Sequence, residues 1–548
     1  MNIPKILSES AKKISARYSD IKFEAAKNPA HGDYATNAAM AAAKKLGKNP
    51  MELAAQIAID LTLMPEVESA SVAAPGFVNI VLTDKFLIDA ARGADKITQT
   101  AAPLKIDMDY GSYNIAKTLQ IGHLRTTIVG DVLNRILRAT GNKTIAYNHL
   151  GDWGRPMGMV IAWILKKYPG RIPKDIPVQE LNAFYPESSA RAKEDPAWLE
   201  FAQKITSQFQ NGNPEYMEIY DWFHKISIDD IMDALDMLHV LPFDYWRGER
   251  YASQFVEQAG KILESKKLIE KDQGAEIVRI KGDTPPLMWK TSHGTETYAA
   301  TDLAAVYYRS ADDNPDKIVY LTDVRQKLHF QQMFDVAKRA ELTRAELTHL
   351  YFGAITGKDG KPFKTRSGNA PALGDIIDTT LEAVRARADA AGKNLSPEDI
   401  RKIAISALKF NDLSHGVADN YVFEPEALVS FEGRTGPYIL YTARRLASIM
   451  AKAGGGGKFG EKIDGAGERA LVMTLSDFDR IVAKAADSFS TELVANYAYD
   501  LAQAINNYYH NYPILKSDNP HRLAMVSVSL AVLSRAIELL GMQIPSEM

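Results

Sequence analysis

The feature that most constrains the fold is a polar turn that ends in Gly122-His123 and leads at once into a long amphipathic segment. Residues 105–110 before the turn resemble a β-strand, and residues 144–149 after the segment do so too. The segment carries apolar residues on one helical face, namely Leu124, Ile128, Val132 and Ile136. The pattern predicts a βαβ unit of a nucleotide-binding fold, with a helix that stops at Gly141-Asn142.

The glycine and the histidine of this turn stand where the predicted helix begins. Backbone N–H groups and the helix dipole at such a position favour a polyphosphate. Gly122 allows a phosphate to approach the backbone closely, and the imidazole of His123 can hydrogen-bond to a phosphoryl oxygen. We therefore expect a nucleotide-phosphate site at this helix start.

The composition is that of an ordinary globular protein and excludes several kinds of site. A chain of 548 residues is too long for one hydrophobic core, and we expect about three domains. We expect neither a membrane span nor a secretory signal, because no apolar run is long enough. The chain has no cysteine, which excludes disulfide bonds and Cys-based zinc sites. With a net charge of −3, contacts with nucleic acid would have to use local basic patches.

Changes of pattern along the chain predict three domains. Residues 1–103 form a separate α+β module that closes at Pro103. From 104 to 378, strand-like and helical segments alternate as in a parallel α/β domain, with a largely helical insertion at 155–290. Residues 379–548 are helical, with one interruption by four glycines at 454–457.

Further motifs accompany the Gly-His turn along the chain. They are Asn114-Ile115-Ala116-Lys117, Gly151-Asp152-Trp153-Gly154, the loop 358–368, and Gly436-Pro437-Tyr438 with Tyr441 and Arg445. Together with Asp33-Tyr34 and residues 75–79, they resemble the motifs of arginyl-tRNA synthetases in the expected order. In this resemblance, residues 120–123 correspond to the HIGH signature of class I aminoacyl-tRNA synthetases, and residues 361–368 correspond to the KMSK loop. The resemblance spans essentially the whole chain.

The resemblance implies a fold class and an activity. The expected fold is α/β, with a Rossmann-like class I catalytic domain between an α+β N-terminal domain and an all-α anticodon-binding bundle. The expected enzyme is an arginine–tRNA ligase, which activates L-arginine with ATP and transfers it to the 3′ end of its tRNA. ATP serves as a substrate together with Mg²⁺, and neither an organic prosthetic group nor a metal site in the protein is expected.

The resemblance also assigns residues to the nucleotide from two sides. Gly122 and His123 would contact the phosphates and the transition state, and Gln120 would be a further ATP contact. Lys364 and Arg366 of the KMSK-like loop would approach the leaving pyrophosphate from the other side.

Three positions depart from the family pattern. The first histidine of the signature is Gln120, which can hydrogen-bond to phosphate but carries no charge. The family's proline before Asn114 is Tyr113, which removes a restraint on φ. The second lysine of the KMSK loop is Thr365. Lys117 of the Asn-x-Ala-Lys element is therefore a candidate for the missing positive charge, both as a catalytic and as an ATP-binding residue.

The second substrate, arginine, carries a planar guanidinium that selection would match with carboxylates in fixed geometry. Tyr298 and Asp302 are four residues apart and share a face if their segment is helical. The resemblance assigns both to the substrate side chain, with Glu249 as a second carboxylate. It assigns Gln326 to the α-amino group and Asn114 to the backbone end of the amino acid.

For tRNA, the resemblance assigns Phe77 and Asn79 to the D-loop, and the C-terminal bundle with Tyr438 and Arg445 to the anticodon. Core packing is the alternative interpretation for Phe77 and for the bundle tyrosines. We further expect a monomeric, cytoplasmic enzyme whose partners are arginine, ATP and the tRNA for arginine, without a membrane.

Three other functions remain open from the sequence. A class I synthetase for another amino acid is disfavoured by the carboxylates of Asp302 and Glu249, which suit a cationic side chain. A catalytically silent paralogue that binds RNA or regulates is disfavoured because both substrate sites are retained. A free-standing nucleotidyltransferase is disfavoured by the tRNA-type modules at the two ends of the chain.

Overall fold

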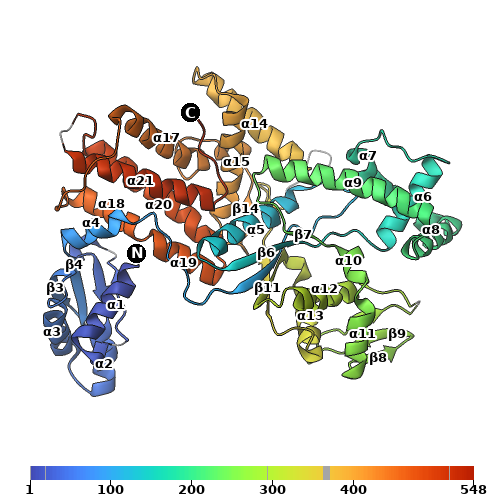
Figure 1. The fold of residues 1–548 in the computed structure, drawn as a ribbon, viewed down its shortest axis with the longest axis horizontal. Helices are drawn as coiled ribbons and strands as arrows, with labels where there is room; N and C mark the ends of the chain where they lie inside the picture. The colour runs from blue at the N-terminus through green and yellow to red at the C-terminus, as the bar shows by residue number, and fades with distance from the viewer. Residues whose placement is uncertain (1, 19, 27, 293, 362–370, 517–518) are drawn as a thin grey trace. The chain divides into compact units, whose positions relative to one another are not determined.

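The computed structural model describes residues 2–18, 20–26, 28–292, 294–361, 371–516 and 519–548. It separates into two compact units (Figure 1). Unit 1 consists of Met1–Gln99, Ser430–Leu539 and Gln543–Met548, and unit 2 consists of Thr100–Val429 and Leu540–Met542. The three domains expected at 1–103, 104–378 and 379–548 stay a prediction, because compactness alone does not identify which parts fold independently.

The N-terminal part of unit 1 is a small antiparallel sheet with helices. Its strands pair in the order β1-β2-β4-β3. Along β4, buried side chains alternate with side chains that are exposed or half-buried. The strands are β1 (Glu24–Ala25), β2 (Tyr34–Thr36), β3 (Val67–Ala73) and β4 (Phe77–Leu82). The helices are α1 (Ile3–Ile14), α2 (Ala38–Leu46), α3 (Pro50–Leu61) and α4 (Asp84–Arg92). Asn49 and Thr83 cap α3 and α4, since their side chains accept hydrogen bonds from first-turn N–H groups.

The C-terminal part of unit 1 is a helical bundle. Helices α17, α20 and α21 pack against one another, and α18 and α19 pack against α20. The bundle consists of α17 (Gly436–Ala453), α18 (Ala466–Ser476), α19 (Phe478–Ser488), α20 (Thr491–Asn511) and α21 (Pro520–Leu539). This confirms the predicted helical C-terminal region.

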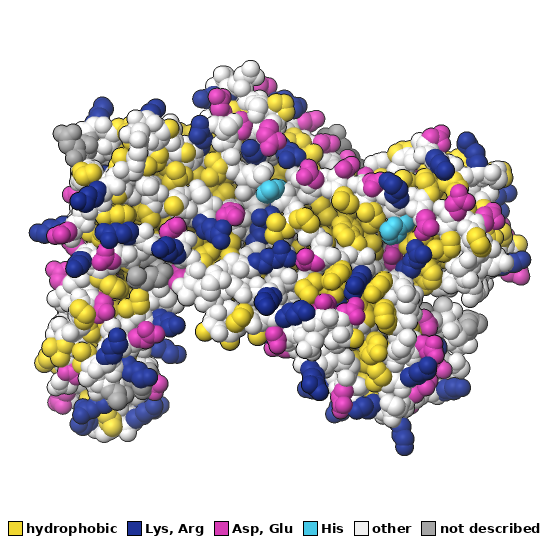
Figure 2. Space-filling view, in the orientation of Figure 1, with side chains coloured by type: hydrophobic (Ala, Val, Ile, Leu, Met, Phe, Trp, Pro, Cys, Tyr) yellow, Lys and Arg dark blue, Asp and Glu magenta, His cyan; other side chains and the backbone are white. Residues whose placement is uncertain are grey.

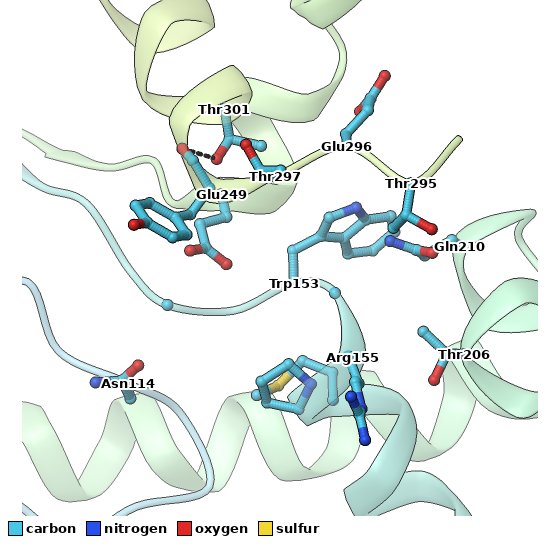
Figure 3. Close-up of a pocket in the computed structure, with 15 residues that line it drawn as sticks. Asn114, Trp153, Arg155, Thr206, Gln210, Glu249, Thr295, Glu296, Thr297 and Thr301 are labelled. Atoms are coloured by element: carbon cyan, nitrogen blue, oxygen red, sulfur yellow. Dashed lines mark hydrogen bonds between the residues drawn. The ribbon is translucent and has the colours of Figure 1, made fainter. Parts of the chain in front are cut away.

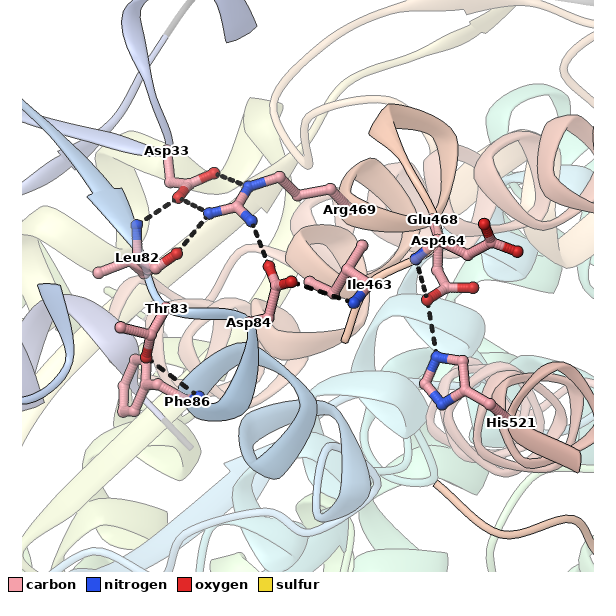
Figure 4. A network of polar contacts seen from close by, with 10 residues as sticks. All are labelled: Asp33, Leu82, Thr83, Asp84, Phe86, Ile463, Asp464, Glu468, Arg469 and His521. Atoms are coloured by element: carbon pink, nitrogen blue, oxygen red, sulfur yellow. Dashed lines mark hydrogen bonds and ion pairs between the residues drawn. The ribbon is translucent and has the colours of Figure 1, made fainter. Parts of the chain in front are cut away.

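One arginine of the bundle joins the two parts of unit 1 (Figure 4). Arg469 of α18 donates to both carboxylate oxygens of Asp33, at 2.8 and 2.6 Å, and to Asp84 at 3.0 Å. It also donates to the carbonyl of Leu82 at 2.6 Å, while the N–H of Leu82 donates to Asp33. The bidentate geometry fixes the end of β4 and the start of α4 against α18.

Unit 2 is built on a parallel five-stranded sheet in the order β12-β11-β5-β6-β7. The strands are β5 (Lys105–Asp109), β6 (Lys143–Asn148), β7 (Tyr245–Trp246), β11 (Lys317–Asp323) and β12 (Glu346–Phe352). Met108 of β5 lies opposite Ala146 of β6 on one side and Val319 of β11 on the other. Because β5 is central, four of its five side chains are buried, as expected for a sheet covered on both faces.

The predicted βαβ unit is confirmed in its three parts. Between β5 and β6 runs α5 (Ile121–Ala139), which is capped at Thr140 before Gly141-Asn142. The four apolar residues predicted for its core face are fully buried: Leu124, Ile128, Val132 and Ile136.

The connection from β6 to β11 is long and mainly helical at first. It contains α6 (Arg155–Lys167), α7 (Val178–Glu194), α8 (Pro196–Gln210), α9 (Pro214–Met237), α10 (Glu249–Ser253), α11 (Val256–Ser265) and α12 (Tyr298–Asp312). A separate antiparallel sheet, in the order β10-β9-β8, lies between α11 and α12 along the chain. Its strands are β8 (Ile269–Asp272), β9 (Ala275–Val278) and β10 (Leu287–Lys290).

The remaining elements of unit 2 follow β11. They are α13 (Lys327–Ala340), α14 (Leu373–Ala390), α15 (Pro397–Leu413), α16 (Pro425–Leu428) and the short parallel pair β13 (Ile355–Thr356) and β14 (Tyr421–Val422). Arg125 of α5 is buried among these later elements and pairs with Asp412 of α15 at 3.3 Å. It also donates to the carbonyls of Gly353 and Asp419, which ties α5 to the amino-terminal end of the parallel β13–β14 pair.

The surface mixes charges of both signs. Figure 2 shows basic and acidic side chains interspersed over the face in view, which agrees with the small net charge. Among the described helices, none is both long and apolar enough to cross a lipid bilayer.

We expect Arg469→Met to destabilise unit 1, because Asp33 and Asp84 would lose a partly buried cationic partner. Hydrogen bonds to charged groups contribute about 2 kcal/mol, and the arginine is only partly exposed, so a loss of about that size is expected. The measurement is the unfolding midpoint by scanning calorimetry, together with the rate of proteolysis within residues 1–99. Arg535→Met is the matched control, since Arg535 pairs with Glu538 on an exposed helix surface and should change stability little. Equal effects of the two substitutions would contradict this role of Arg469.

Candidate active site

The order of the parallel strands sets the place of the site. The chain runs from β5 outward to β6 and β7, and returns to the other side of β5 with β11. Such a reversal leaves a crevice beyond the carboxyl ends of the two strands that flank it, where open α/β sheets bind ligands. Residues 110–120 leave β5 at this point, and α5 begins directly after them.

His123 is held in one orientation at the first turn of α5. Its Nδ1 accepts a hydrogen bond from the backbone N–H of Gln120 at 2.9 Å. Burial, together with the nearby charge of Lys117, lowers the pKa of His123 to about 4, so the ring is neutral at pH 7. Because Nδ1 is the acceptor, the remaining proton is assigned to Nε2, which is thus a hydrogen-bond donor.

Gly122 and Gln120 leave space in front of this helix end. Both residues are exposed, and a Cβ built on Gly122 would meet no atom within 4 Å. The N–H of Ile121 donates to the carbonyl of Pro371 at 3.1 Å and that of His123 to the carbonyl of Gln120 at 2.8 Å. The space open to an anion at this helix start is therefore the space beside Gly122.

The loop before α5 carries Asn114 and Lys117, both exposed. Ala116 between them has a φ of 55°, in the left-handed region, and its N–H donates to Oγ of Ser227 at 2.9 Å. A non-glycine residue in this region carries a small conformational cost, which the bond to α9 helps to offset. The left-handed turn lies between Asn114, which lines the cavity described below, and Lys117, which is not among the described lining residues.

Asn114 is joined to the Gly-Asp-Trp-Gly turn. It forms an isolated parallel bridge with Gly151, whose carbonyl accepts from the N–H of Ile115. A Cβ at Gly151 would lie only 2.3 Å from Oδ1 of Asn114. Glycine is therefore required at 151 for the side chain of Asn114 to occupy its position.

A cavity of about 390 Å³ lies beside this turn (Figure 3). It brings together three residues predicted to bind the amino acid: Asn114, Glu249 and Tyr298. In Figure 3 the carboxylate of Glu249 points into the space between Trp153 and Asn114. The other lining residues come from the Gly-Asp-Trp-Gly turn, α6, α8 and the segment 295–301.

Glu249 is a partly buried carboxylate that lines the cavity. It is the first residue of α10, and Asp152 fixes this helix start by accepting from the N–H of Arg250 at 2.9 Å. Burial raises the pKa of Glu249 to about 7, with the charges of Asp302 and Asp152 adding to the effect and His149 opposing it. A guanidinium in the cavity would reverse this shift.

Asp302 lies one helical turn after Tyr298 on α12, and two histidines hold it. Nε2 of His329 lies 2.6 Å from its Oδ2, and Nε2 of His149 lies 3.4 Å from its Oδ1. Burial raises the pKa of Asp302, but the bonds from the histidines outweigh this, so the net pKa is well below its usual range. Tyr298 is exposed and its ring packs on His329, with 4.8 Å between centroids.

The other predicted residues of unit 2 fall outside the cavity or outside the described residues. Gln326 ends the short helix η3 (Val324–Gln326) after β11 and is exposed, but it is not among the described residues that line the cavity. Lys364, Thr365 and Arg366 lie in 362–370, outside the described residues.

The predicted tRNA contacts belong to unit 1. Phe77 is 38% exposed at the start of β4, so it is not simple core, and Asn79 is half-buried in the same strand. Tyr438 on α17 accepts a hydrogen bond from Asn506 at 3.0 Å. The guanidinium of Arg445 lies 3.7 Å from the ring centre of Tyr509, as a cation–π pair.

Sequence reasoning missed three residues that shape the site: His149, His329 and Asp152. His149 directly follows β6, and residues at the carboxyl ends of parallel strands are those that face a ligand, so its position was a usable signal. Asp152 was noted only as part of a motif.

In the part of the chain that the structure describes, no group of three or more His, Asp or Glu side chains could hold a metal ion.

Comparisons with known proteins cover the same parts. The family described as "tRNA synthetases class I (R), catalytic domain" matches residues 87–425. The "Arginyl tRNA synthetase N terminal domain" matches residues 1–82, and the "DALR anticodon binding domain" matches residues 439–548.

Full-length relatives and solved structures agree with these matches. The chain is 35% identical to an arginine–tRNA ligase of Alkaliphilus oremlandii, over 93% of each chain. It is 34% identical to one of Francisella tularensis subsp. novicida over 100% of each. Its fold is similar to that of arginyl-tRNA synthetases from Plasmodium falciparum, with a TM-score of 0.82, 24% identity and coverage of 100% and 98%. The Thermus thermophilus structure gives 0.81 and 22%, with full coverage of both. The chain therefore belongs to the arginyl-tRNA synthetase family of class I aminoacyl-tRNA synthetases.

Proposed function

We propose that the chain acts as an arginine–tRNA ligase and that its chemistry takes place at the carboxyl ends of β5, β6 and β11. The observation that carries the proposal is the full-length match to arginine–tRNA ligases at 34% identity. The protein would convert L-arginine and ATP to arginyl-adenylate and pyrophosphate, and would then transfer arginine to the 3′ end of its tRNA. Membership of class I implies the use of ATP.

The proposed ATP site is the N-terminus of α5. The open space at Gly122 and the Nε2–H of His123 support contacts to phosphate oxygens, and the exposed amide of Gln120 can add another. A neutral imidazole that donates from a fixed position needs no rearrangement when charge develops on the phosphate. Mg²⁺ would accompany the nucleotide, since it is commonly held by phosphates and water with few protein ligands.

The proposed positive charges at the pyrophosphate are Lys117, Lys364 and Arg366. The exposure of Lys117 five residues before Gly122 supports its approach to the same phosphates. Since Thr365 stands where the family's loop has its second lysine, Lys117 would supply that charge.

The proposed arginine site is the cavity with its neighbouring carboxylate. Asn114 would contact the backbone end of the substrate, and Gln326 its α-amino group. Glu249, Tyr298 and Asp302 would face the side chain. The raised pKa of Glu249 and the histidine contacts of Asp302 support this, because among the described residues neither carboxylate has an ion pair with arginine or lysine.

The proposed tRNA contacts are Phe77 and Asn79 for the D-loop, and Tyr438 and Arg445 for the anticodon. The partial exposure of Phe77 supports a ring that can stack on a base. The proposal includes a monomeric enzyme in the cytoplasm, where charged tRNA is used.

The test of the function is ATP–pyrophosphate exchange with arginine, lysine or citrulline, each with and without tRNA. Arginine with tRNA should support exchange. Citrulline should not, because it is nearly isosteric with arginine but lacks the charge that the carboxylates select. If arginine gives no exchange even with tRNA, the proposal is wrong and the silent paralogue is favoured. If lysine is preferred, the chain is a synthetase for another amino acid.

We expect Lys117→Ala to lower the exchange rate about a hundredfold, the usual cost of removing one group that stabilises transition-state charge. Stability should change little, because Lys117 is exposed. The measurements are exchange kinetics and the melting temperature. Lys143→Ala is the control, since Lys143 is exposed at the opposite, amino-terminal end of β6 and carries the same charge. Near-normal exchange in Lys117→Ala would rule out the proposed role.

We expect the KM for arginine to rise as the pH falls below 7. Glu249 has a raised pKa of about 7, so acid protonates it and the guanidinium must displace that proton. Between pH 8 and pH 6 the KM should rise about tenfold, because the deprotonated fraction of Glu249 falls about tenfold over this range.

Steady-state kinetics of Glu249→Gln should show a high KM without this pH dependence. Glu296→Gln should keep the dependence, because Glu296 lies exposed at the rim of the same cavity. An unchanged pH profile in Glu249→Gln would assign the effect to another group.

A further inference from the structure

Tyr113, which stands where the family has proline, is fully buried directly behind the ring of His123. The two ring centroids are 5.9 Å apart, with an angle of 67° between the planes, so the rings meet edge to face. Phe243 also packs on Tyr113 edge to face, with 6.4 Å between centroids and 90° between the planes. The tyrosine therefore fills the space between the core of unit 2 and the imidazole.

A hydrogen-bond relay also joins Tyr113 to His123. The hydroxyls of Tyr113 and Thr127 are 2.7 Å apart, and the hydroxyl of Thr127 donates to the carbonyl of His123 at 2.6 Å. A threonine hydroxyl has one proton, and this one is used on His123. Tyr113 must therefore donate to Thr127. Burial keeps this phenol protonated by raising its pKa.

The backbone before Tyr113 is shaped for this arrangement. Gly111 has a φ of 89°, and a Cβ there would lie 2.9 Å from the ring of Tyr113. Ser112 also has a positive φ, of 49°. Two consecutive left-handed residues turn the chain so that the tyrosine side chain points inward, toward α5.

We propose that Tyr113 is a positioning residue that fixes the His123 imidazole, as its neutral Nε2–H tautomer, toward the nucleotide. The inference deepens the proposed function and rests on it only for the identity of the ligand. Proline restrains this loop through its covalent ring. Here the restraint comes from packing and from the relay through Thr127, and it acts on the catalytic side chain itself.

The kinetic test compares Tyr113→Phe, Tyr113→Leu and Thr127→Val in arginine- and tRNA-dependent exchange. Tyr113→Leu removes the ring edge, so kcat should fall about tenfold or more because the donor is misplaced. The KM for arginine should stay within about twofold, because the cavity residues are untouched. Tyr113→Phe removes one bond of the relay and Thr127→Val removes both, so the double variant should lose no more than Thr127→Val alone.

The control for loss of a buried hydroxyl is Tyr110→Phe. Tyr110 is also fully buried and packs on the same Phe243, with 4.5 Å between centroids, but the described contacts give it no link to Thr127 or His123. This variant should keep the kinetics of the unsubstituted protein.

The decisive readout is nuclear magnetic resonance of ¹⁵N-labelled histidine. The signal of His123 is assigned by its absence from the spectrum of His123→Asn. Among the described residues, Lys117 is the charged side chain that acts on the pKa of His123, and Tyr113 is the titratable ring in contact with it. In the unsubstituted protein, His123 should be the Nε2–H tautomer and stay neutral between about pH 5 and pH 8. In Tyr113→Leu its pKa should rise by about one unit or more, and both tautomers should appear. Tyr113→Phe keeps the ring and should largely restore the pKa.

An unchanged tautomer, pKa and kcat in Tyr113→Leu, with only a lower melting temperature, would overturn the inference. The spectra do not depend on activity. If exchange is absent in every sample, the proposed function fails, while the spectra still decide whether Tyr113 positions His123. If Tyr113→Leu does not fold, the Tyr113→Phe and Thr127→Val cycle decides, and independent, additive losses would count against the relay.

Discussion

The central place of β5 in the parallel sheet is the constraint on which the site depends. Strands β6 and β11 pair with it on its two sides, so the chain reverses direction across the sheet at this strand. The loop after β5 must then cross the crevice, and α5 begins directly after this loop, at Ile121. This loop carries Asn114, which lines the cavity, and Lys117, whose charge acts on His123 at the start of α5.

Burial governs the electrostatics of Glu249, which lines the cavity, and of Asp302 near it, and neither has an arginine or lysine ion-pair partner in the described parts of the chain. Glu249 is forced toward its neutral form, while Asp302 keeps its charge only through His149 and His329. A carboxylate that is desolvated and lacks a permanent partner has more to gain from a guanidinium than one exposed to water. If the cavity binds arginine as proposed, it disfavours an uncharged substrate of equal size, since the carboxylates would be left unpaired.

At the proposed nucleotide site, the side chain of His123 is held rigidly. The imidazole of His123 is fixed by the N–H of Gln120 at Nδ1 and by Tyr113 at its edge, and its backbone is fixed by Thr127. Arg125, two residues further along α5, is anchored on three backbone and side-chain groups of later elements. The helix start is thus tied to distant parts of unit 2 on its buried side while its exposed side stays open.

The sequence by itself determined the βαβ unit, the helical C-terminal region and the family, because these depend on local periodicity, glycine position and motif order. The core face of α5 and the helix start at Gly122 were predictable for that reason. Only the tertiary structure decided that His149 and His329 share Asp302, that Asp152 sets the start of α10 beside Glu249, and that Tyr113 turns inward against His123. These contacts join residues far apart along the chain or depend on positive φ angles at Gly111 and Ser112. Local patterns carry no information on which side chains meet across a folded core, since packing and burial settle that choice.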